Sequence, residues 1–190
     1  MVELLYPVET VAPVVKGASA PTAAEMLPII EPNGLVTAQA ARFVCHGGSK
    51  LLHPVVHLHV VNRSGEVYLQ RRSPAKTLYP MYWDTAVGGH VSYGEYMQEA
   101  LYREAAEEIG LFDFNPQDIT TFVWESMREK ELVNVYATVG DFKLSPDNDE
   151  VCEGRFWKVG EIEAAIGKNI LTPELEYEFP LVKNQLLSLL

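Results

Sequence analysis

The segment GGHVSYGEYMQEALYREAAEEIGL, from Gly88 to Leu111, constrains the fold most, because its helix combines apolar residues with carboxylates on one face. The pattern predicts a helix from about Gly94 to Ile109 that ends at Gly110, a typical helix C-cap. The helical repeat places four residues on one stripe: Met97, Leu101, Glu104 and Glu108. Such a stripe must be covered, so we expect the helix to pack on a β-sheet.

The acidic residues of this helix predict a metal site. Glu104 and Glu108 lie on its apolar side, and Glu107 lies at the edge. Carboxylates turned inward together repel one another and raise each other's pKa unless a cation neutralises them. Oxygen ligands grouped in this way suit Mg²⁺ or Mn²⁺, which carboxylates often share with substrate phosphates. A solvated helix face is the usual explanation of an acidic run, but it fits these positions poorly.

Composition and charge limit the partners of the chain. Its 190 residues are 47% hydrophobic and carry a formal net charge of -11. This charge argues against a nucleic acid polymer or an anionic membrane as partner, so a polyanionic substrate needs a metal or a few placed cations. The two cysteines, Cys45 and Cys152, form neither a disulfide framework nor a zinc pattern. Without a membrane-length apolar run or signal-peptide features, we expect a cytoplasmic protein.

The sequence divides into a short arm and one domain. Residues 1–23 are rich in Pro, Ala and Val, and we expect either a mobile arm or a segment packed on the partner subunit of a homodimer. Residues 24–190 alternate strand-like and helix-like segments, which predicts a mixed α/β domain with helices on both faces of a sheet. Strands are expected within residues 25–43, 53–61, 66–72, 81–89, 119–127, 132–140 and 152–159, and C-terminal helices within 161–167 and 173–190.

The helical segment also carries a family resemblance. Gly89, a gap of five residues, Glu95, a gap of seven, and REAAEEIGL from Arg103 to Leu111 resemble the Nudix box. Ala105 is smaller than the aliphatic residue often found at its position. The resemblance implies a Nudix-like α/β/α sandwich with a loop–helix–loop catalytic motif. It also implies a hydrolase that acts on a small-molecule substrate in which a nucleoside diphosphate is linked to another moiety.

The residue roles below are implied by the same resemblance. The metal ligands by position are Glu104, Glu107, Glu108 and the backbone carbonyl of Gly88. Arg103 would orient Glu104, and Glu95 would brace the loop. The implied reaction is metal-assisted hydrolysis, in which Mg²⁺ neutralises the diphosphate and lowers the pKa of a bound water. The proton would go to Glu104 or to a carboxylate on a loop, for which the sequence offers Glu125, Glu129, Glu131 and Glu150.

A wider stretch, from about Met26 to Trp157, resembles the branch of the superfamily nearest type I isopentenyl-diphosphate isomerase. In those enzymes an Arg and a Lys bind the substrate diphosphate, and Arg72 and Lys76 occupy their places. The alternative for these two residues is an ordinary solvated loop after a strand. Diphosphate binding is favoured, because an acidic protein that attracts phosphate needs placed cations, and Arg and Lys are the side chains that suit phosphate.

Three histidines match positions that hold a metal in the isomerases: His46, His53 and His90. Imidazoles can bind Zn²⁺ or Mn²⁺ once a strand and loops bring them together. The alternative is that each is an ordinary half-buried histidine, and His57 and His59 follow a simple strand alternation. The sequence therefore leaves a second metal site open.

The isomerase activity itself is not expected. In the isomerases a cysteine stands before the Gly-His pair, where this chain has Gly88, which can transfer no proton. Their Glu-x-Glu pair in a later strand is matched with Val133, Asn134 and Val135, with Glu131 out of register. We therefore expect a diphosphate hydrolase, with a prenyl diphosphate isomerase and a non-catalytic ligand-sensing module as alternatives. The intact box disfavours the sensing module.

Overall fold

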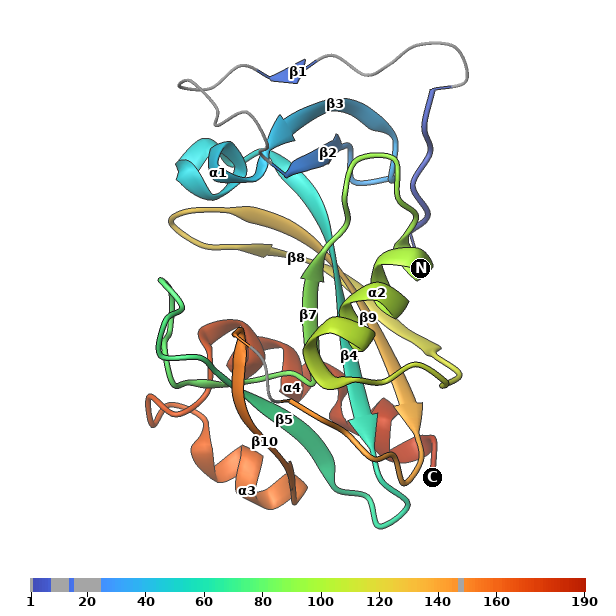
Figure 1. Cartoon of the computed structure of the whole chain (residues 1–190), viewed down its shortest axis with the longest axis vertical. Helices are drawn as coiled ribbons and strands as arrows, with labels where there is room; N and C mark the ends of the chain where they lie inside the picture. The colour runs from blue at the N-terminus through green and yellow to red at the C-terminus, as the bar shows by residue number, and fades with distance from the viewer. Residues whose placement is uncertain (1, 8–13, 16–24, 147–148) are drawn as a thin grey trace. The chain divides into compact units, whose positions relative to one another are not determined.

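The computed structural model describes residues 2–7, 14–15, 25–146 and 149–190 (Figure 1). The chain forms two compact units that alternate along the sequence. The first unit contains residues 1–56, 89–100 and 121–134, and the second contains residues 57–88, 101–120 and 135–190. Several elements begin in one unit and end in the other, including β4 (Leu52–Val61), β9 (Lys130–Val139) and helix α2 (Met97–Ile109).

Most of the expected strands belong to one seven-stranded sheet. Its order is β10-β5-β4-β9-β8, with β6 paired to β5 and β7 paired to β4. The remaining bounds are β5 (Val67–Arg72), β6 (Trp83–Asp84), β7 (Val87–His90), β8 (Gln117–Glu125) and β10 (Val151–Trp157). The single strand predicted for residues 81–89 is wrong, because its two halves pair with different neighbours and form β6 and β7. The mixed α/β class predicted from the sequence is confirmed.

The first unit also contains a small sheet in the order β1-β3-β2 (Figure 1). Its strands are β1 (Val14–Val15), β2 (Met26–Ile30) and β3 (Val36–Ala41), followed by helix α1 (Arg42–Val44) and a helical turn over Cys45–Ser49. The EPNG turn predicted between β2 and β3 is confirmed by a 2.9 Å hydrogen bond from Gly34 N to Glu31 O. A Cβ at Gly34 would lie 2.0 Å from the carbonyl oxygen of Glu3, so only glycine fits there.

The N-terminal residues pack on the first unit of their own chain. Leu5 N donates to Gly34 O at 3.0 Å, and Val36 N donates to Leu5 O at 3.0 Å. The hydroxyl of Tyr6 accepts a 2.8 Å hydrogen bond from Gly94 N. Residues 2–7 are therefore attached to their own chain by hydrogen bonds. The other residues of the expected arm, apart from β1, lie outside the described residues.

Helix α2 begins at Met97, three residues later than the predicted start at Gly94. Its predicted end is confirmed, because Gly110 has a φ of 64° and its N–H donates to Ala106 O at 3.2 Å. The predicted apolar stripe is buried. In the second unit its member Leu101 and the neighbouring Ile109 are fully buried, and its member Glu108 is only 6% exposed.

Two C-terminal helices complete the second unit, α3 (Val159–Ala165) and α4 (Pro173–Ser188). Helix α4 begins with a typical cap, in which Thr172 Oγ1 accepts from Leu175 N at 3.3 Å and Pro173 follows. Its buried face consists of Leu175, Glu178, Phe179, Val182 and Leu186. Among the residues that the structure describes, no helix is both long and apolar enough to cross a bilayer.

The carboxylate on the buried face of α4 belongs to an ion cluster. His57 and His59 point to the same side of β4, as the strand alternation predicts, and both contact Glu178. His57 Nδ1 lies 2.7 Å from Glu178 Oε2, and His59 Nε2 lies 2.6 Å from Oε1. Burial opposes charge on both partners, but their attraction is larger: the pKa of Glu178 falls to about 2, and that of His57 rises to about 10. The cluster ties α4 to the sheet.

Candidate functional site

The carboxylates of the acidic helix lie in the second unit, and Glu108 is the most buried of them. Its Oε2 accepts hydrogen bonds from Gly88 N at 3.1 Å and from Gln70 Nε2 at 2.9 Å. Strand β5 provides Gln70, and strand β7 provides Gly88. Two strands of the sheet therefore fix the position of the Glu108 carboxylate. Gly88, whose carbonyl is an expected metal ligand, donates its N–H to this carboxylate.

Arg103 lies between the other two carboxylates of the helix. Its Nη1 donates to Glu104 Oε1 at 2.7 Å and to Glu107 Oε2 at 3.3 Å. The side chain of Glu104 is 14% exposed, whereas that of Glu107 is 61% exposed. Glu104 is thus in contact with a neighbouring guanidinium, and Glu107 extends into solvent.

The electrostatics of these carboxylates favour a cation. Burial raises the pKa of Glu108 to about 8, and the nearby carboxylates of Glu104 and Glu150 add to the rise. Burial also raises the pKa of Glu104, with further rises from Glu107 and Glu150 and an opposing effect of Arg103. Arg103 beside Glu104 and Glu107, and Lys76 beside Glu150, supply two positive charges against four carboxylates. A divalent cation would remove the repulsion and return the carboxylates to their charged form.

Glu150 is the loop carboxylate that the structure brings to this group. Its Oε2 contacts Lys76 Nζ, and its backbone oxygen accepts from Ser73 N at 2.8 Å. Lys76, one of the two predicted diphosphate ligands, therefore stands beside the carboxylates. The other three loop candidates, Glu125, Glu129 and Glu131, lie in the first unit.

Arg72, the second predicted diphosphate ligand, is engaged within the protein. Its Nη1 donates to Asp84 Oδ2 at 3.0 Å, and its Nε donates to Leu78 O at 3.2 Å. Asp84 Oδ1 in turn accepts from Thr172 Oγ1 at 2.8 Å. These contacts give the guanidinium a fixed position at the base of the loop that follows β5.

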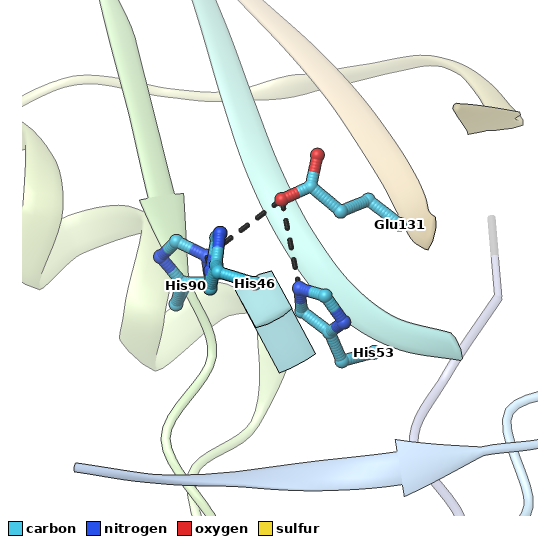
Figure 2. A group of neighbouring side chains, drawn as sticks. All are labelled: His46, His53, His90 and Glu131. Carbon is cyan, nitrogen blue, oxygen red and sulfur yellow. Dashed lines mark hydrogen bonds and ion pairs between the residues drawn. The ribbon is translucent and has the colours of Figure 1, made fainter. Parts of the chain in front are cut away.

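The three histidines singled out in the sequence come together in the first unit (Figure 2). His46, His53, His90 and Glu131 each offer one ligand atom, and these atoms lie within 4.8 Å of one another. His46 Nε2 is 2.9 Å from His90 Nε2, and Glu131 Oε1 is 3.5 Å from His53 Nε2 and 3.7 Å from His90 Nε2. Three imidazoles and one carboxylate form a ligand set that suits a transition metal.

Hydrogen bonds orient two of these rings toward the cluster. His53 Nδ1 lies 2.9 Å from the carbonyl oxygen of Leu51, an arrangement in which Nδ1 donates and Nε2 keeps its lone pair. That Nε2 is buried without a hydrogen-bond partner among the described residues. His46 Nδ1 contacts Glu129, which turns its Nε2 inward. Burial lowers the pKa of His90 to about 4, so its ring is neutral at pH 7, as a ligand must be.

The structure adds Glu131 to the histidines, which the sequence did not do. Glu131 is buried on β9 beside them. Burial raises its pKa, but the attraction of the nearby His53 and His90 rings outweighs burial and lowers the pKa below the usual value. Val133 and Val135, which correspond to the Glu-x-Glu pair of the isomerases, are fully buried apolar residues of the same strand. Strand register, which the sequence does not show, decides this position.

A family model of the NUDIX domain matches residues 51–175, about two thirds of the chain. The chain belongs to the Nudix family. A Nudix hydrolase of Streptomyces coelicolor, described as uncharacterized, is 30% identical over 162 residues, which are 80% of this chain and 85% of that protein. Another, from Pseudomonas aeruginosa, is 35% identical over 95 residues, but the match spans only 50% of this chain and 56% of the relative.

Relatives of this Nudix chain also include isomerases. The isopentenyl-diphosphate Delta-isomerase of Leifsonia xyli is 26% identical over 162 residues, which are 78% of this chain and 83% of that enzyme. Among solved structures, DR0079 of Deinococcus radiodurans superimposes with a TM-score of 0.70 at 23% identity, over 80% of this chain and 96% of that one. This likeness confirms the Nudix-like α/β fold predicted from the sequence.

Proposed function

We propose that the protein is a divalent-metal-dependent hydrolase that cleaves a diphosphate linkage in a nucleoside-diphosphate type of substrate. The observation that carries the proposal is the buried carboxylate of Glu108, crowded by Glu104 and Glu150, in a chain of the Nudix family. Carboxylates that hold each other's pKa high in the absence of a cation are a favourable ligand set for Mg²⁺ or Mn²⁺. Glu104, Glu107, Glu108 and the carbonyl of Gly88 are its proposed ligands.

When bound, the metal would neutralise the diphosphate and lower the pKa of an attacking water. Side chains of the protein would orient the metal ligand, bind the phosphate and accept the proton. Arg103 keeps Glu104 in one orientation through the 2.7 Å contact. Lys76 stands where it can bind a phosphate oxygen after leaving Glu150. Glu150 then becomes available to take the proton of the water, so it joins Glu104 as the proposed general base.

The test is hydrolysis of a panel of nucleoside diphosphate compounds with Mg²⁺ or Mn²⁺. We expect release of phosphate or monophosphate by the native protein, and a loss of about 10²-fold or more in Glu104→Gln and Glu108→Gln, since each removes a metal ligand or a base. Glu163→Gln is a matched control, because its carboxylate lies on helix α3 and pairs with Lys183 in an exposed position. Full activity in both box variants would exclude this function.

We also propose that the histidine cluster of the first unit holds a transition metal such as Zn²⁺ or Mn²⁺. The ligand set His46, His53, His90 and Glu131 supports it, together with the hydrogen bonds that leave ring nitrogens facing inward. Metal analysis of the purified protein should find a tightly held ion that His53→Ala loses. Cys152→Ser, which removes an exposed thiol, should keep it. Equal metal contents in the native protein and His53→Ala would contradict the proposal.

Isomerisation of a prenyl diphosphate is the second candidate. The similarity to the Leifsonia xyli isomerase and the carboxylate of Glu131 among the histidines favour it. Double-bond migration needs an acid and a base on opposite faces of the substrate. Gly88 has no side chain to serve as one of them. We expect no conversion of isopentenyl diphosphate to dimethylallyl diphosphate above background with Mg²⁺ and Zn²⁺ supplied, and a rate that scales with protein concentration would overturn this.

A further inference from the structure

The loop between β5 and β6, residues 73–82, borders the carboxylates of the proposed hydrolytic site. The ammonium group of Lys76, on this loop, contacts the carboxylate of Glu150. Strand β5 leads directly into this loop, and its Gln70 donates to Glu108 Oε2 at 2.9 Å. A diphosphate bound at these groups would therefore lie beside the loop, and the loop is available to contact whatever the diphosphate carries.

The tip of this loop has a strained backbone. Tyr79 has a φ of 48° and Met81 a φ of 67°, with Pro80 between them. This left-handed region is rarely occupied by residues other than glycine and asparagine, and it is least favourable for bulky side chains. Two such residues in three positions cost free energy that the rest of the loop has to offset.

Hydrogen bonds from β5 hold the strained backbone in place. Arg72 N donates to Tyr82 O at 2.9 Å, and Met81 N donates to Arg72 O at 3.1 Å. The side chains of the two arginines add further bonds, from Arg72 Nε to Leu78 O at 3.2 Å and from Arg71 Nε to Met81 O at 3.0 Å. The tip is thus preorganised, and Arg72 serves as its support.

The preorganised tip presents apolar side chains to solvent. Tyr79 is 43% exposed and Met81 is 39% exposed. The ring of Tyr79 lies 5.6 Å from that of Tyr82, and no residue from 77 to 82 carries a charge. Neither exposed apolar surface nor a left-handed backbone stabilises a fold. Their combination at a proposed active site is typical of a ligand-binding surface.

We propose that Tyr79, Pro80 and Met81 form the subsite that receives the planar nucleobase of the substrate. The inference rests on the proposed hydrolase function and adds the residues that bind the base. Tyrosine rings stack on bases through their π faces, and the thioether of methionine makes favourable contacts with aromatic rings. An uncharged tip with a preorganised backbone suits such a ring because the loop loses little backbone freedom on binding.

The length of the loop is compatible with this arrangement. Tyr79 is three residues beyond Lys76, so their Cα atoms are separated by at most roughly 11 Å. A ligand whose phosphates contact Lys76 therefore has to extend only a short way to reach the Tyr79 ring. The same support from Arg72 would set the distance between phosphate and ring.

Calorimetric titration with two non-hydrolysable probes, each with Mg²⁺, tests the subsite. One probe is the α,β-methylene analogue of ADP, and the other is methylenediphosphonate, which has no organic group. We expect Tyr79→Ala to weaken binding of the ADP analogue by about 5-fold or more and to leave methylenediphosphonate within about twofold. Tyr79→Phe should keep the native affinities. Tyr177→Ala is the matched control, because it removes a tyrosine of similar exposure, 48%, on helix α4.

The outcomes separate the subsite from the hydrolase proposal. If both probes bind the native protein and Tyr79→Ala changes their affinities by equal factors, the subsite is wrong while the metal-diphosphate site stands. If methylenediphosphonate does not bind with Mg²⁺, the hydrolase proposal fails, and the subsite fails with it. An isopentenyl methylenediphosphonate that loses as much affinity as the ADP analogue would overturn the aromatic assignment.

A second variant shows whether a loss of affinity comes from the missing ring or from misfolding. Tyr79→Gly removes the same ring but suits the observed φ of 48°, because glycine has no Cβ to clash. We expect its midpoint of urea unfolding to be no lower than that of the native protein. Its affinity for the ADP analogue should fall as in Tyr79→Ala. Native affinity in the stable Tyr79→Gly variant would refute the subsite.

Discussion

Replacing Glu178 by Gln should destabilise the second unit, because Glu178 is the buried anion between two histidines. Its side chain is fully buried, and its two oxygens lie 2.7 Å from His57 Nδ1 and 2.6 Å from His59 Nε2. The substitution keeps the shape of the side chain and removes its charge. His57 would then be left as a buried cation next to the weaker anion contact of Glu174, which lies 3.7 Å from its Nε2.

The pKa values give the size of the effect. The pKa of Glu178 falls from 4.5 to about 2, which corresponds to about 3 kcal/mol. That of His57 rises from 6.5 to about 10, which corresponds to about 5 kcal/mol. Both pKa shifts arise from the same interaction between Glu178 and His57, so the two free energies are not added. The range agrees with the 3–5 kcal/mol lost when one partner of a buried ion pair is removed, and we take about 3 kcal/mol as the expected loss near pH 6.

The pH dependence has a defined sign. The folded pKa of Glu178 lies below its unfolded value, so its contribution is present above about pH 4.5 and disappears as the pH falls toward 2. The folded pKa of His57 lies above its unfolded value, so its contribution is complete below about pH 6.5 and disappears as the pH rises toward 10. The cluster therefore contributes most between about pH 4.5 and 6.5, and the cost of Glu178→Gln should shrink in alkaline solution, where His57 can become neutral.

Urea unfolding followed by tryptophan fluorescence measures this prediction, since Trp83 and Trp157 both lie in the second unit. Glu163→Gln is the control, because its pair with Lys183 is exposed and such pairs contribute about 0–1 kcal/mol. A free energy of unfolding for Glu178→Gln within about 1 kcal/mol of the native value at pH 6 would refute the reasoning. So would an unchanged loss between pH 6 and pH 9.

Three further predictions follow from other contacts. Gly34→Ala should lower the unfolding midpoint, since its Cβ would lie 2.0 Å from Glu3 O at a φ of 87°; a native midpoint in urea would contradict this. Mg²⁺ affinity, measured by calorimetry, should rise with pH up to about 8, because Glu108 with its raised pKa must lose a proton to bind metal, and a flat profile from pH 6 to 8 would argue against this ligand. Tyr6→Phe should cost about 0.5–1.5 kcal/mol through loss of the hydroxyl that accepts from Gly94 N, and calorimetric unfolding would detect it.

Local patterns in the sequence determined the elements that carry the site. Three features depend on residues only a few positions apart: the stripe of α2 with its glycine C-cap, the turn before Leu35, and the hairpin of β4 and β5. Periodicity and turn chemistry therefore predict them. The family and the carboxylates Glu104 and Glu108 followed from one continuous motif.

Contacts between distant segments needed the tertiary structure. The place of Glu131 beside the three histidines was not readable from the sequence, because the histidines come from other segments and the sequence does not show which strands pair. Glu150 could not be proposed over the other loop carboxylates from the sequence, because its contact with Lys76 depends on the path of the β5–β6 loop. Glu178 gave no signal at all, because its partners stand about 120 residues earlier in the chain, on strand β4. Burial and charge pairing arise from these long-range contacts, and the sequence specifies them only through the complete fold.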